Sequence, residues 1–300
     1  NRYLCYIANI AFQCLNFCRG SSMISEKEIE KYIGKTTKIE DQIDYARASV
    51  AKNFFNLPDL TLNEGTPLPK YWHWFFCWET ASKDLLGRDG HIKPGNNIIP
   101  NSGFPRRMWG GGDIVFFKPL EIGMRVSREI TLENIKYKNG SSGKLSIIQI
   151  RNDYKNNKNI LLSEKQNLIY LPNREKFSKS ETKENYDLSS LVKEKAFTSQ
   201  QLFQYSALTM NSHRIHYDLD YCKTIEFYPN LVVHGPLIAQ QLVDIADQKL
   251  NGNLKKFEFK ALNPIFVEDK FSMNLINKDN FLDLWVNDKS GNISMTAKAT

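Results

Sequence analysis

The sequence predicts an α+β protein, and two features of its C-terminal half lead to this class. The clearest helix is GPLIAQQLVDIADQKL, residues 235–250, in which apolar residues form a broad stripe. Gly235 and Pro236 open the helix, since proline suits the first helical position, and Gly252 lies just past its end. Beyond it, alternating apolar and polar residues predict a run of strands. We therefore expect a largely enclosed helix against a sheet.

Two segments of the chain resemble each other and indicate a duplication. IVFFKPLEIGMRVSREITLENI, residues 114–135, aligns with FEFKALNPIFVEDKFSMNLINK, residues 257–278. Each copy predicts a strand, a turn that contains proline and a second strand, and a longer strand follows each copy. A polar stretch rich in charge and serine, residues 173–195, predicts a linker between units at residues 23–172 and 196–300. The matched positions are Pro119 with Pro264, Leu120 with Ile265, Ile122 with Val267, Arg125 with Lys270 and Val126 with Phe271.

The composition is that of an ordinary globular protein with a basic balance. Of the 300 residues, 41% are hydrophobic and 24% charged, and the formal net charge is +7. Lys and Arg are scattered, and no basic run exceeds two residues, so the charge does not predict a nucleic-acid ligand. The five cysteines are odd in number and include no CxxC pair, which favours reduced thiols in a cytosolic-type compartment over a disulfide framework.

The first 22 residues differ from the rest of the chain. They contain an apolar run, YLCYIANIAFQCLNFC, flanked by Arg2 and Arg19, which is too short and too polar to predict a membrane helix. The sequence from Met23 is typical of an ordinary protein start, so we interpret residues 1–22 as upstream read-through or, alternatively, as a targeting segment. No other stretch predicts a membrane span.

The candidate site is NSHRIHYDLDY, residues 211–221, together with a histidine in NLVVHGPL. His213, His216 and His234 could supply three metal ligands, one of them could act as a general acid–base, or all could be structural. We favour acid–base catalysis, because polar residues cluster beside a Gly-Pro helix start. The free N–H of Gly235 at that start would attract a developing oxyanion. A histidine near such a donor suits proton transfer alpha to a carbonyl.

These motifs resemble the hydratase signature of MaoC-like hot-dog proteins. NSHRIHYD followed by LVVHGPL is similar to the double hot-dog branch of mesaconyl-C4-CoA (3-methylfumaryl-CoA) hydratase and mitochondrial type 2 3-hydroxyacyl-thioester dehydratase. PLPKYWHWFFCWE, GRDGH and FPRRMWGGGDIVFFKPLEIGMRV resemble the N-terminal half of that branch. The resemblance covers most of the chain from Met23 onward. It implies a double hot-dog fold, in which two curved antiparallel sheets each wrap on a long helix.

The resemblance also implies a reaction, the addition or removal of water across the 2,3 double bond of an enoyl thioester. His216 stands at the histidine of the wider motif, as the acid–base group. Asn211 stands where that motif has aspartate, and an amide cannot take a proton, so Asn211 could only orient the water or the imidazole. His213 becomes a candidate second acid–base group, and the N–H of Gly235 the donor to the thioester carbonyl. Arg214 could pair with a substrate carboxylate, or with Asp218 or Asp220. His234 is expected to orient the loop, and the possible CoA contacts are Arg106, Arg107 and Trp109.

We therefore expect a hydro-lyase, with mesaconyl-C4-CoA hydratase as the preferred function and a fatty 3-hydroxyacyl-thioester dehydratase as the alternative. A non-catalytic acyl-CoA-binding protein would fit Asn211, and a thioesterase would need Asp218 or Asp220 to face the thioester. No metal or redox cofactor, nucleic acid or membrane is expected as a partner, and a homodimer of double hot-dogs is considered. The expected location is cytoplasmic, or mitochondrial in a eukaryote.

Overall fold

The computed structural model describes residues 24–140, 143–179, 182 and 190–300. Residues 1–22, interpreted above as read-through or a targeting segment, lie outside the described residues, and so do Cys5, Cys14 and Cys18. Within the predicted linker, residues 180–181 and 183–189 also lie outside them. The two described cysteines, Cys77 and Cys222, are buried free thiols. No helix among the described residues is long and apolar enough to cross a membrane.

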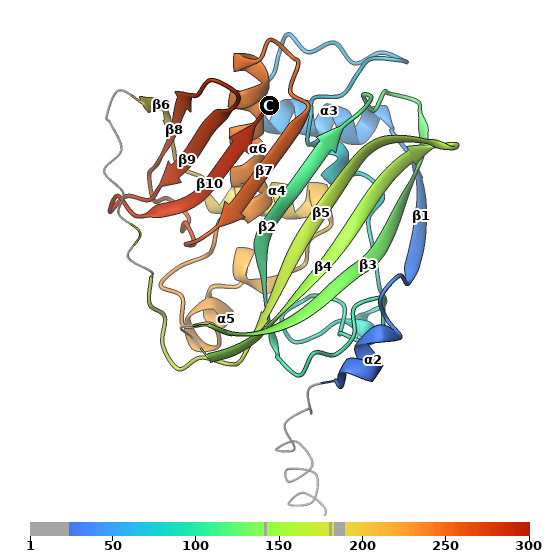
Figure 1. The fold of residues 1–300 in the computed structure, drawn as a ribbon. Helices are drawn as coiled ribbons and strands as arrows, with labels where there is room; N and C mark the ends of the chain where they lie inside the picture. Colours follow the sequence, from blue (N-terminus) through green and yellow to red (C-terminus); the bar gives the residue numbers. More distant parts are fainter. Residues whose placement is uncertain (1–23, 141–142, 180–181, 183–189) are drawn as a thin grey trace, which may run out of the picture.

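The described strands form one antiparallel sheet of ten strands (Figure 1). Its order is β1-β3-β4-β5-β2-β7-β10-β9-β8-β6. The strands are β1 (Thr36–Gln42), β2 (Arg106–Phe116), β3 (Arg125–Gly140), β4 (Gly143–Asn156), β5 (Asn159–Leu171), β6 (Leu191–Lys195), β7 (Lys256–Ala261), β8 (Phe271–Asn277), β9 (Leu282–Asn287) and β10 (Ile293–Ala299).

The strand order is a repeat. Each half contributes five strands, and from each outer edge to the middle these follow in the chain order first, third, fourth, fifth and second. The two halves meet where β2 pairs with β7. The aligned segments around Pro119 and Pro264 form the equivalent connections from β2 to β3 and from β7 to β8. The structure thus has the predicted duplication, but the two expected sheets are joined edge to edge into one. Residues 191–195, assigned to the linker, form the edge strand β6, which pairs with β8.

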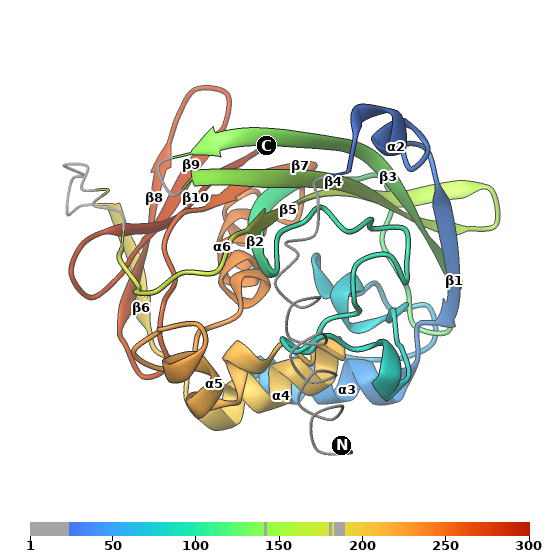
Figure 2. The same ribbon diagram turned by 90° about the horizontal axis from the view of Figure 1, so that it is seen from below.

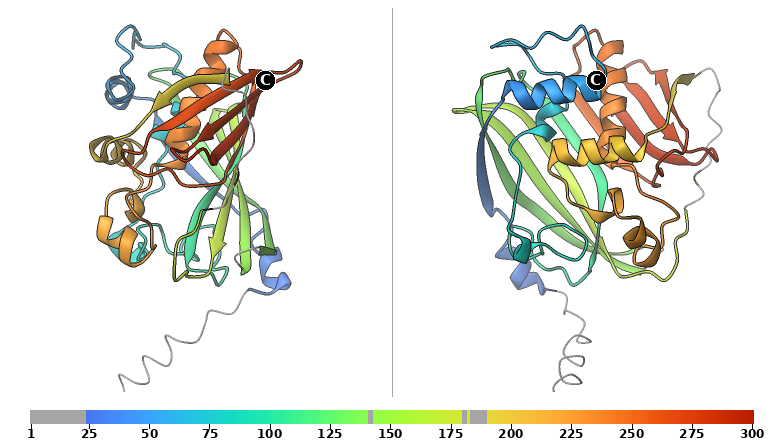
Figure 3. Two further views of the ribbon diagram at one scale, coloured as in Figure 1. Left: turned by 90° about the vertical axis from the view of Figure 1, so that its left-hand side faces the viewer. Right: turned by 180° about the vertical axis from the view of Figure 1, so that it is seen from behind.

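The helices lie inside the curve of the sheet. Seen from below, the sheet arches over α6, and α3 and α4 run across the open side (Figure 2). From behind, α3, α4 and α6 lie on one face of the sheet (Figure 3). The described helices are α2 (Glu26–Glu30), α3 (Tyr45–Phe54), α4 (Ser199–Thr209), α5 (Leu219–Thr224) and α6 (Gly235–Lys249), with short 3-10 turns η1 (Trp72–Phe75), η2 (Lys83–Leu85) and η4 (Arg214–His216).

The predicted long helix is confirmed as α6. Proline stands in its first turn, and its residues from Pro236 to Val243 are all buried. Just past its end, Gly252 adopts φ +80°, and its N–H donates to the carbonyl of Asp247. This backbone conformation favours glycine, which explains why the helix ends there. The helix α4 begins with a capping box, in which Thr198 and Gln201 each bond the other's backbone N–H.

A second long helix was expected in the first half, and this expectation is wrong for the described residues. Between β1 and β2 the first half has the ten-residue helix α3 and the 3-10 turns η1 (Trp72–Phe75) and η2, and no counterpart of the fifteen-residue α6 follows α3. Tyr71 and Cys77 flank the turn with positive φ angles of 76° and 55°, which break helical geometry. Aromatic side chains take the place of a helix, since Trp72 and Phe75 are at most 1% exposed and share one core with α6.

Candidate active site

A cavity of about 410 Å³ lies between the two halves of the molecule. Its lining comes from η4 and the residues before it, from the start of α6, and from the N-terminal strand β2 with the loop around Gly90. The structure brings most of the sequence-predicted site residues to this cavity. Those that line it are Asn211, His213, His216, Gly235, Arg106, Arg107 and Trp109, whereas Arg214 and His234 do not.

His216 has one ring nitrogen free to act on a substrate. Its Nδ1 lies 2.7 Å from the carbonyl oxygen of Val232. A carbonyl can only accept, so Nδ1 carries the hydrogen and Nε2 is left as an acceptor. Burial lowers the pKa of His216 to about 4, although the hydrogen bond to Val232 works in the opposite direction. At neutral pH the imidazole is therefore uncharged and able to accept a proton at Nε2.

The imidazole ring of His234 stacks on that of His216. The two imidazole rings stack with centroids 3.6 Å apart and planes 17° from parallel. His234 is fully buried, and its Nε2 lies 2.8 Å from the hydroxyl of Ser206 on α4. Burial, and to a smaller extent His216, holds the pKa of His234 well below its usual value. The stack thus fixes the plane of His216, while burial lowers the pKa of both rings.

Gly235 lines the cavity at the first turn of α6. An N–H in the first turn has no partner within its own helix and lies at the positive end of the helix dipole. A Cβ at this position would lie 2.7 Å from the indole ring of Trp109, so only glycine allows β2 to approach the helix so closely. The N-terminal half thereby covers the start of α6 in the C-terminal half.

Asn211 shapes the turn that carries His213. Its Oδ1 accepts the backbone N–H of His213 at 3.0 Å, so this oxygen is already engaged in a local turn. The ring of His213 lies 5.5 Å from His216 and 4.3 Å from His91, measured between centroids. Burial, followed by the charges of neighbouring groups including His91, lowers the pKa of His213 well below its usual value.

Arg214 points away from the cavity. Its Nε and Nη2 donate to Oδ2 of Asp218 at 3.0 and 2.7 Å, and its Nη1 donates to the carbonyl of Arg88 at 3.1 Å. Of the two partners considered from the sequence, a substrate carboxylate and a neighbouring aspartate, the structure supplies the second. Arg214 therefore links the 211–216 segment to a loop of the N-terminal half.

The two neighbouring arginines of β2 have different environments. Arg106 is buried and forms an ion pair with Glu226, with Nε 2.8 Å from Oε2. Arg107 is half-buried and lines the cavity, and within the described residues its guanidinium has neither a hydrogen bond nor an ion pair. Arg106 is thus held by the fold, while Arg107 remains available to an anionic ligand.

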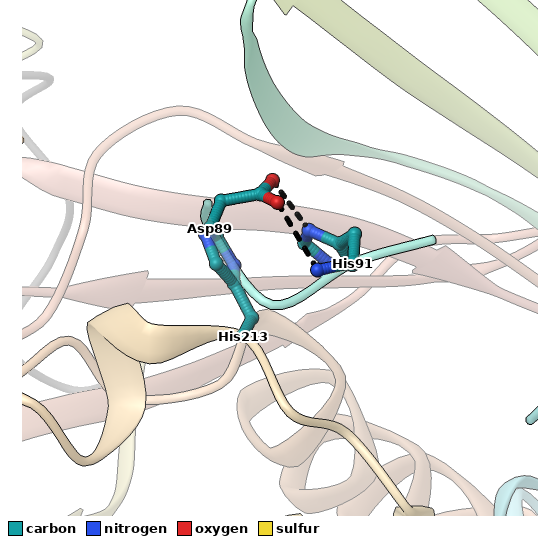
Figure 4. A group of neighbouring side chains, drawn as sticks. All are labelled: Asp89, His91 and His213. Carbon is teal, nitrogen blue, oxygen red and sulfur yellow. Dashed lines mark hydrogen bonds and ion pairs between the residues drawn. The ribbon is translucent and has the colours of Figure 1, made fainter. Parts of the chain in front are cut away.

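Asp89 and His91, from the GRDGH segment, were not among the sequence-predicted site residues. Oδ2 of Asp89 lies 2.9 Å from Nδ1 of His91, and Oδ1 accepts the His91 backbone N–H at 3.1 Å (Figure 4). His91 lines the cavity. Burial raises the pKa of Asp89, but the hydrogen bonds and charge of His91 outweigh it and the pKa is lowered. An Asp-x-His spacing in a chain with only five histidines is a signal that could have singled out this pair.

The histidines considered as metal ligands do not converge. The rings of His216 and His234 lie face to face, and one nitrogen of each is held by Val232 or Ser206. Within the described residues, the group with atoms near enough to one another, within 4.8 Å, is Asp89, His91 and His213. Both oxygens of Asp89 already accept hydrogen bonds from His91, so an ion would have to displace them.

The low pKa of His216 has a consequence for stability. An ordinary histidine has a pKa of about 6.5, so between about pH 6.5 and 4 His216 is protonated in the unfolded chain but neutral in the folded protein. The free energy of unfolding should therefore fall by about 2–3 kcal/mol from this group as pH drops from 7.5 to 4.5. Urea unfolding of the protein and of His216→Gln at both pH values measures the difference. If the free energy of unfolding depended on pH identically in both proteins, the low pKa of His216 would be contradicted.

Comparisons with known proteins identify the family of the chain. The profile of the hydroxyacyl-thioester dehydratase type 2 (Htd2) family matches residues 71–267. The mesaconyl-C(4)-CoA hydratase of Chloroflexus aurantiacus is 34% identical over 239 residues, which cover 78% of this chain and 84% of that protein. The mitochondrial hydroxyacyl-thioester dehydratase type 2 of Schizosaccharomyces pombe is 25% identical over 250 residues, covering 74% and 81%.

Solved structures show the same fold. A MaoC-like dehydratase from Phytophthora capsici matches with a TM-score of 0.67 and 12% identity, covering 92% of this chain and 98% of that one. A protein from Mycobacterium tuberculosis described as having a double hot-dog fold matches with a TM-score of 0.55 and 8% identity, covering 89% and 95%. The fold is therefore a double hot-dog, and the chain belongs to the hydroxyacyl-thioester dehydratase type 2 family of MaoC-like hydro-lyases.

Proposed function

We propose that this protein hydrates a dicarboxylic enoyl-CoA thioester of the mesaconyl-C4-CoA type, with His216 as general base and Gly235 N–H as oxyanion donor. The observation that carries the proposal is that the acceptor nitrogen of His216 and the first-turn N–H of Gly235 belong to residues lining one cavity. The substrate class is supported by the similarity to mesaconyl-C(4)-CoA hydratase, which exceeds that to the yeast dehydratase.

The reaction needs a proton acceptor and a donor to an oxyanion. As the water oxygen bonds to C3, Nε2 of His216 takes one water proton, and the double-bond electrons move toward the thioester oxygen. The N–H of Gly235, at the positive end of α6, stabilises that developing charge. The imidazolium then returns its proton to C2, and the reverse steps remove water. No electrons are gained or lost overall, so the proposed reaction needs no redox cofactor.

Arg107 supports a substrate with a second carboxylate. In mesaconyl-C4-CoA the acyl group carries a free carboxylate on the carbon that receives the hydroxyl. A half-buried guanidinium that lines the cavity, with neither a hydrogen bond nor an ion pair among the described residues, would gain charge-assisted hydrogen bonds from such a group. We assign this role to Arg107 and no longer to Arg214, whose guanidinium bonds Asp218.

The second candidate is a fatty 3-hydroxyacyl-thioester dehydratase, which the family profile and the yeast relative favour. Its substrate has no second carboxylate, so Arg107 would then contact a CoA phosphate instead. A non-catalytic thioester-binding protein would fit Asn211, which offers no carboxylate to the water, but the similarity to hydratases and dehydratases disfavours it.

An assay with three thioesters separates these functions. Purified protein is mixed with mesaconyl-C4-CoA, crotonyl-CoA or a longer enoyl-CoA, and loss of enoyl thioester absorbance gives kcat/KM for each. We expect the highest kcat/KM with mesaconyl-C4-CoA, since it alone carries a carboxylate for Arg107. A preference for the longer enoyl-CoA would establish the dehydratase alternative, and binding of all three without turnover would establish a binding protein.

The role of Arg107 can be tested by its own substitution. Arg107→Met should reduce kcat/KM for mesaconyl-C4-CoA roughly 10- to 100-fold, because charge-assisted hydrogen bonds contribute about 1.5–3 kcal/mol. It should leave crotonyl-CoA hydration nearly unchanged. Arg214→Met is the matched control, and it should affect both substrates by the same factor, since Arg214 contacts protein groups only. Equal losses on both substrates for Arg107→Met would refute carboxylate recognition by this residue.

A further inference from the structure

We propose that His91, held by Asp89, is a further catalytic residue that accepts a hydrogen bond from the water added to the substrate. The inference rests on the proposed function, because it assumes that His216 takes the other water proton. A nucleophilic water is best oriented when both of its O–H groups have acceptors, since a lone pair then points at the carbon under attack. His216 supplies one acceptor, so the cavity should contain a second.

Asn211 is poorly suited to be the second acceptor. Its amide oxygen accepts the backbone N–H of His213, and the amide nitrogen is a donor. His213 lines the cavity, but within the described residues no hydrogen bond fixes which of its ring nitrogens carries the proton. His91 also lines the cavity, and its tautomer is fixed.

The tautomer of His91 follows from Asp89. The lowered pKa of Asp89 means that its carboxylate is ionised, so Oδ2 accepts the Nδ1–H of His91 at 2.9 Å. Burial, followed by the charge of Arg107, lowers the pKa of His91 although Asp89 works in the opposite direction, so the ring is neutral and its Nε2 is left as an acceptor. Figure 4 shows the carboxylate facing the imidazole of His91, with His213 coming from the opposite segment. Asp89 does not line the cavity, and its role is to position His91.

The loop that carries His91 is fixed against the segment that carries His213 and His216. The backbone N–H of Arg214 donates to the carbonyl of Asp89 at 2.8 Å, and the hydroxyl of Ser212 donates to the carbonyl of Gly90 at 2.5 Å. Gly90 has φ +95°, and a Cβ there would lie 1.9 Å from the carbonyl oxygen of Ser212. The two segments therefore touch through their backbones, which places His91 on the site with little freedom to move.

Asp89→Asn tests the positioning role. An asparagine can donate its amide hydrogen to Nδ1, which moves the ring proton to Nε2 and turns the acceptor into a donor. We expect kcat for hydration to fall about 10²-fold or more, within the range of acid–base effects, while KM for the thioester changes little. Asp89→Glu keeps a carboxylate and should recover part of kcat. Asp84→Asn, an exposed aspartate nearby that does not line the cavity, is the matched control and should behave like the wild type.

Further measurements separate the role of His91 from effects on folding and from metal binding. The melting temperature of Asp89→Asn and saturation of its thioester binding show whether the site is intact, and His91→Gln should give the same loss of kcat. Activity of either variant within threefold of an active wild type would overturn the role of His91 without touching that of His216. The wild type should keep its activity on treatment with EDTA. If EDTA removed the activity and Zn²⁺ restored it, the role of His91 as a water acceptor would be overturned in favour of an ion held by Asp89, His91 and His213.

Discussion

The hydrogen bond from His216 Nδ1 to the carbonyl of Val232 is the contact on which the proposed chemistry depends. It consumes the one proton of a neutral imidazole and leaves Nε2 free toward the cavity. Burial keeps the ring neutral, and the stacked ring of His234 holds its plane. Val232 leads directly into the turn that starts α6, so the residue that orients the base also precedes the N–H that would receive the oxyanion.

The duplicated sheet is what completes this site. The C-terminal half supplies His216 and Gly235, but the cavity wall that faces them belongs to the N-terminal half. Pairing of β2 with β7 brings Trp109 onto the start of α6, where only glycine leaves room for the ring. The same strand carries Arg107, and the Asp89 loop is bound to the 212–214 backbone. One half thus carries the proposed base and oxyanion donor, and the other carries the groups that we expect to recognise the acyl chain and water.

Local patterns in the sequence were sufficient for some of these features and not for others. The helix α6 was predictable because its start, stripe and end are all encoded within eighteen consecutive residues, from Gly235 to Gly252. The gathering of His213, His216 and Gly235 was predictable from the family resemblance and their closeness in the chain. The ion pair of Arg214 with Asp218 was one of two alternatives that the sequence left open. An aspartate four residues along and a substrate carboxylate are both suitable partners for the guanidinium, and the sequence alone does not show the substrate. The approach of His91 to His213 joins residues 122 positions apart, and no local pattern encodes such a contact. The lack of a counterpart to α6 after α3 in the N-terminal half depends on aromatic packing, which the periodicity of the sequence does not reveal.

The most direct measurement of the central claim is single-turnover hydration of the preferred enoyl thioester by His216→Gln, with thioester binding measured on the same protein. Glutamine preserves most of the side-chain volume but cannot take a proton at neutral pH. We expect the rate of the chemical step to fall about 10²- to 10⁴-fold while the dissociation constant of the thioester stays close to that of the wild type. A rate within a few-fold of the wild type, in a protein that binds the thioester normally, would contradict the assignment of His216 as the base.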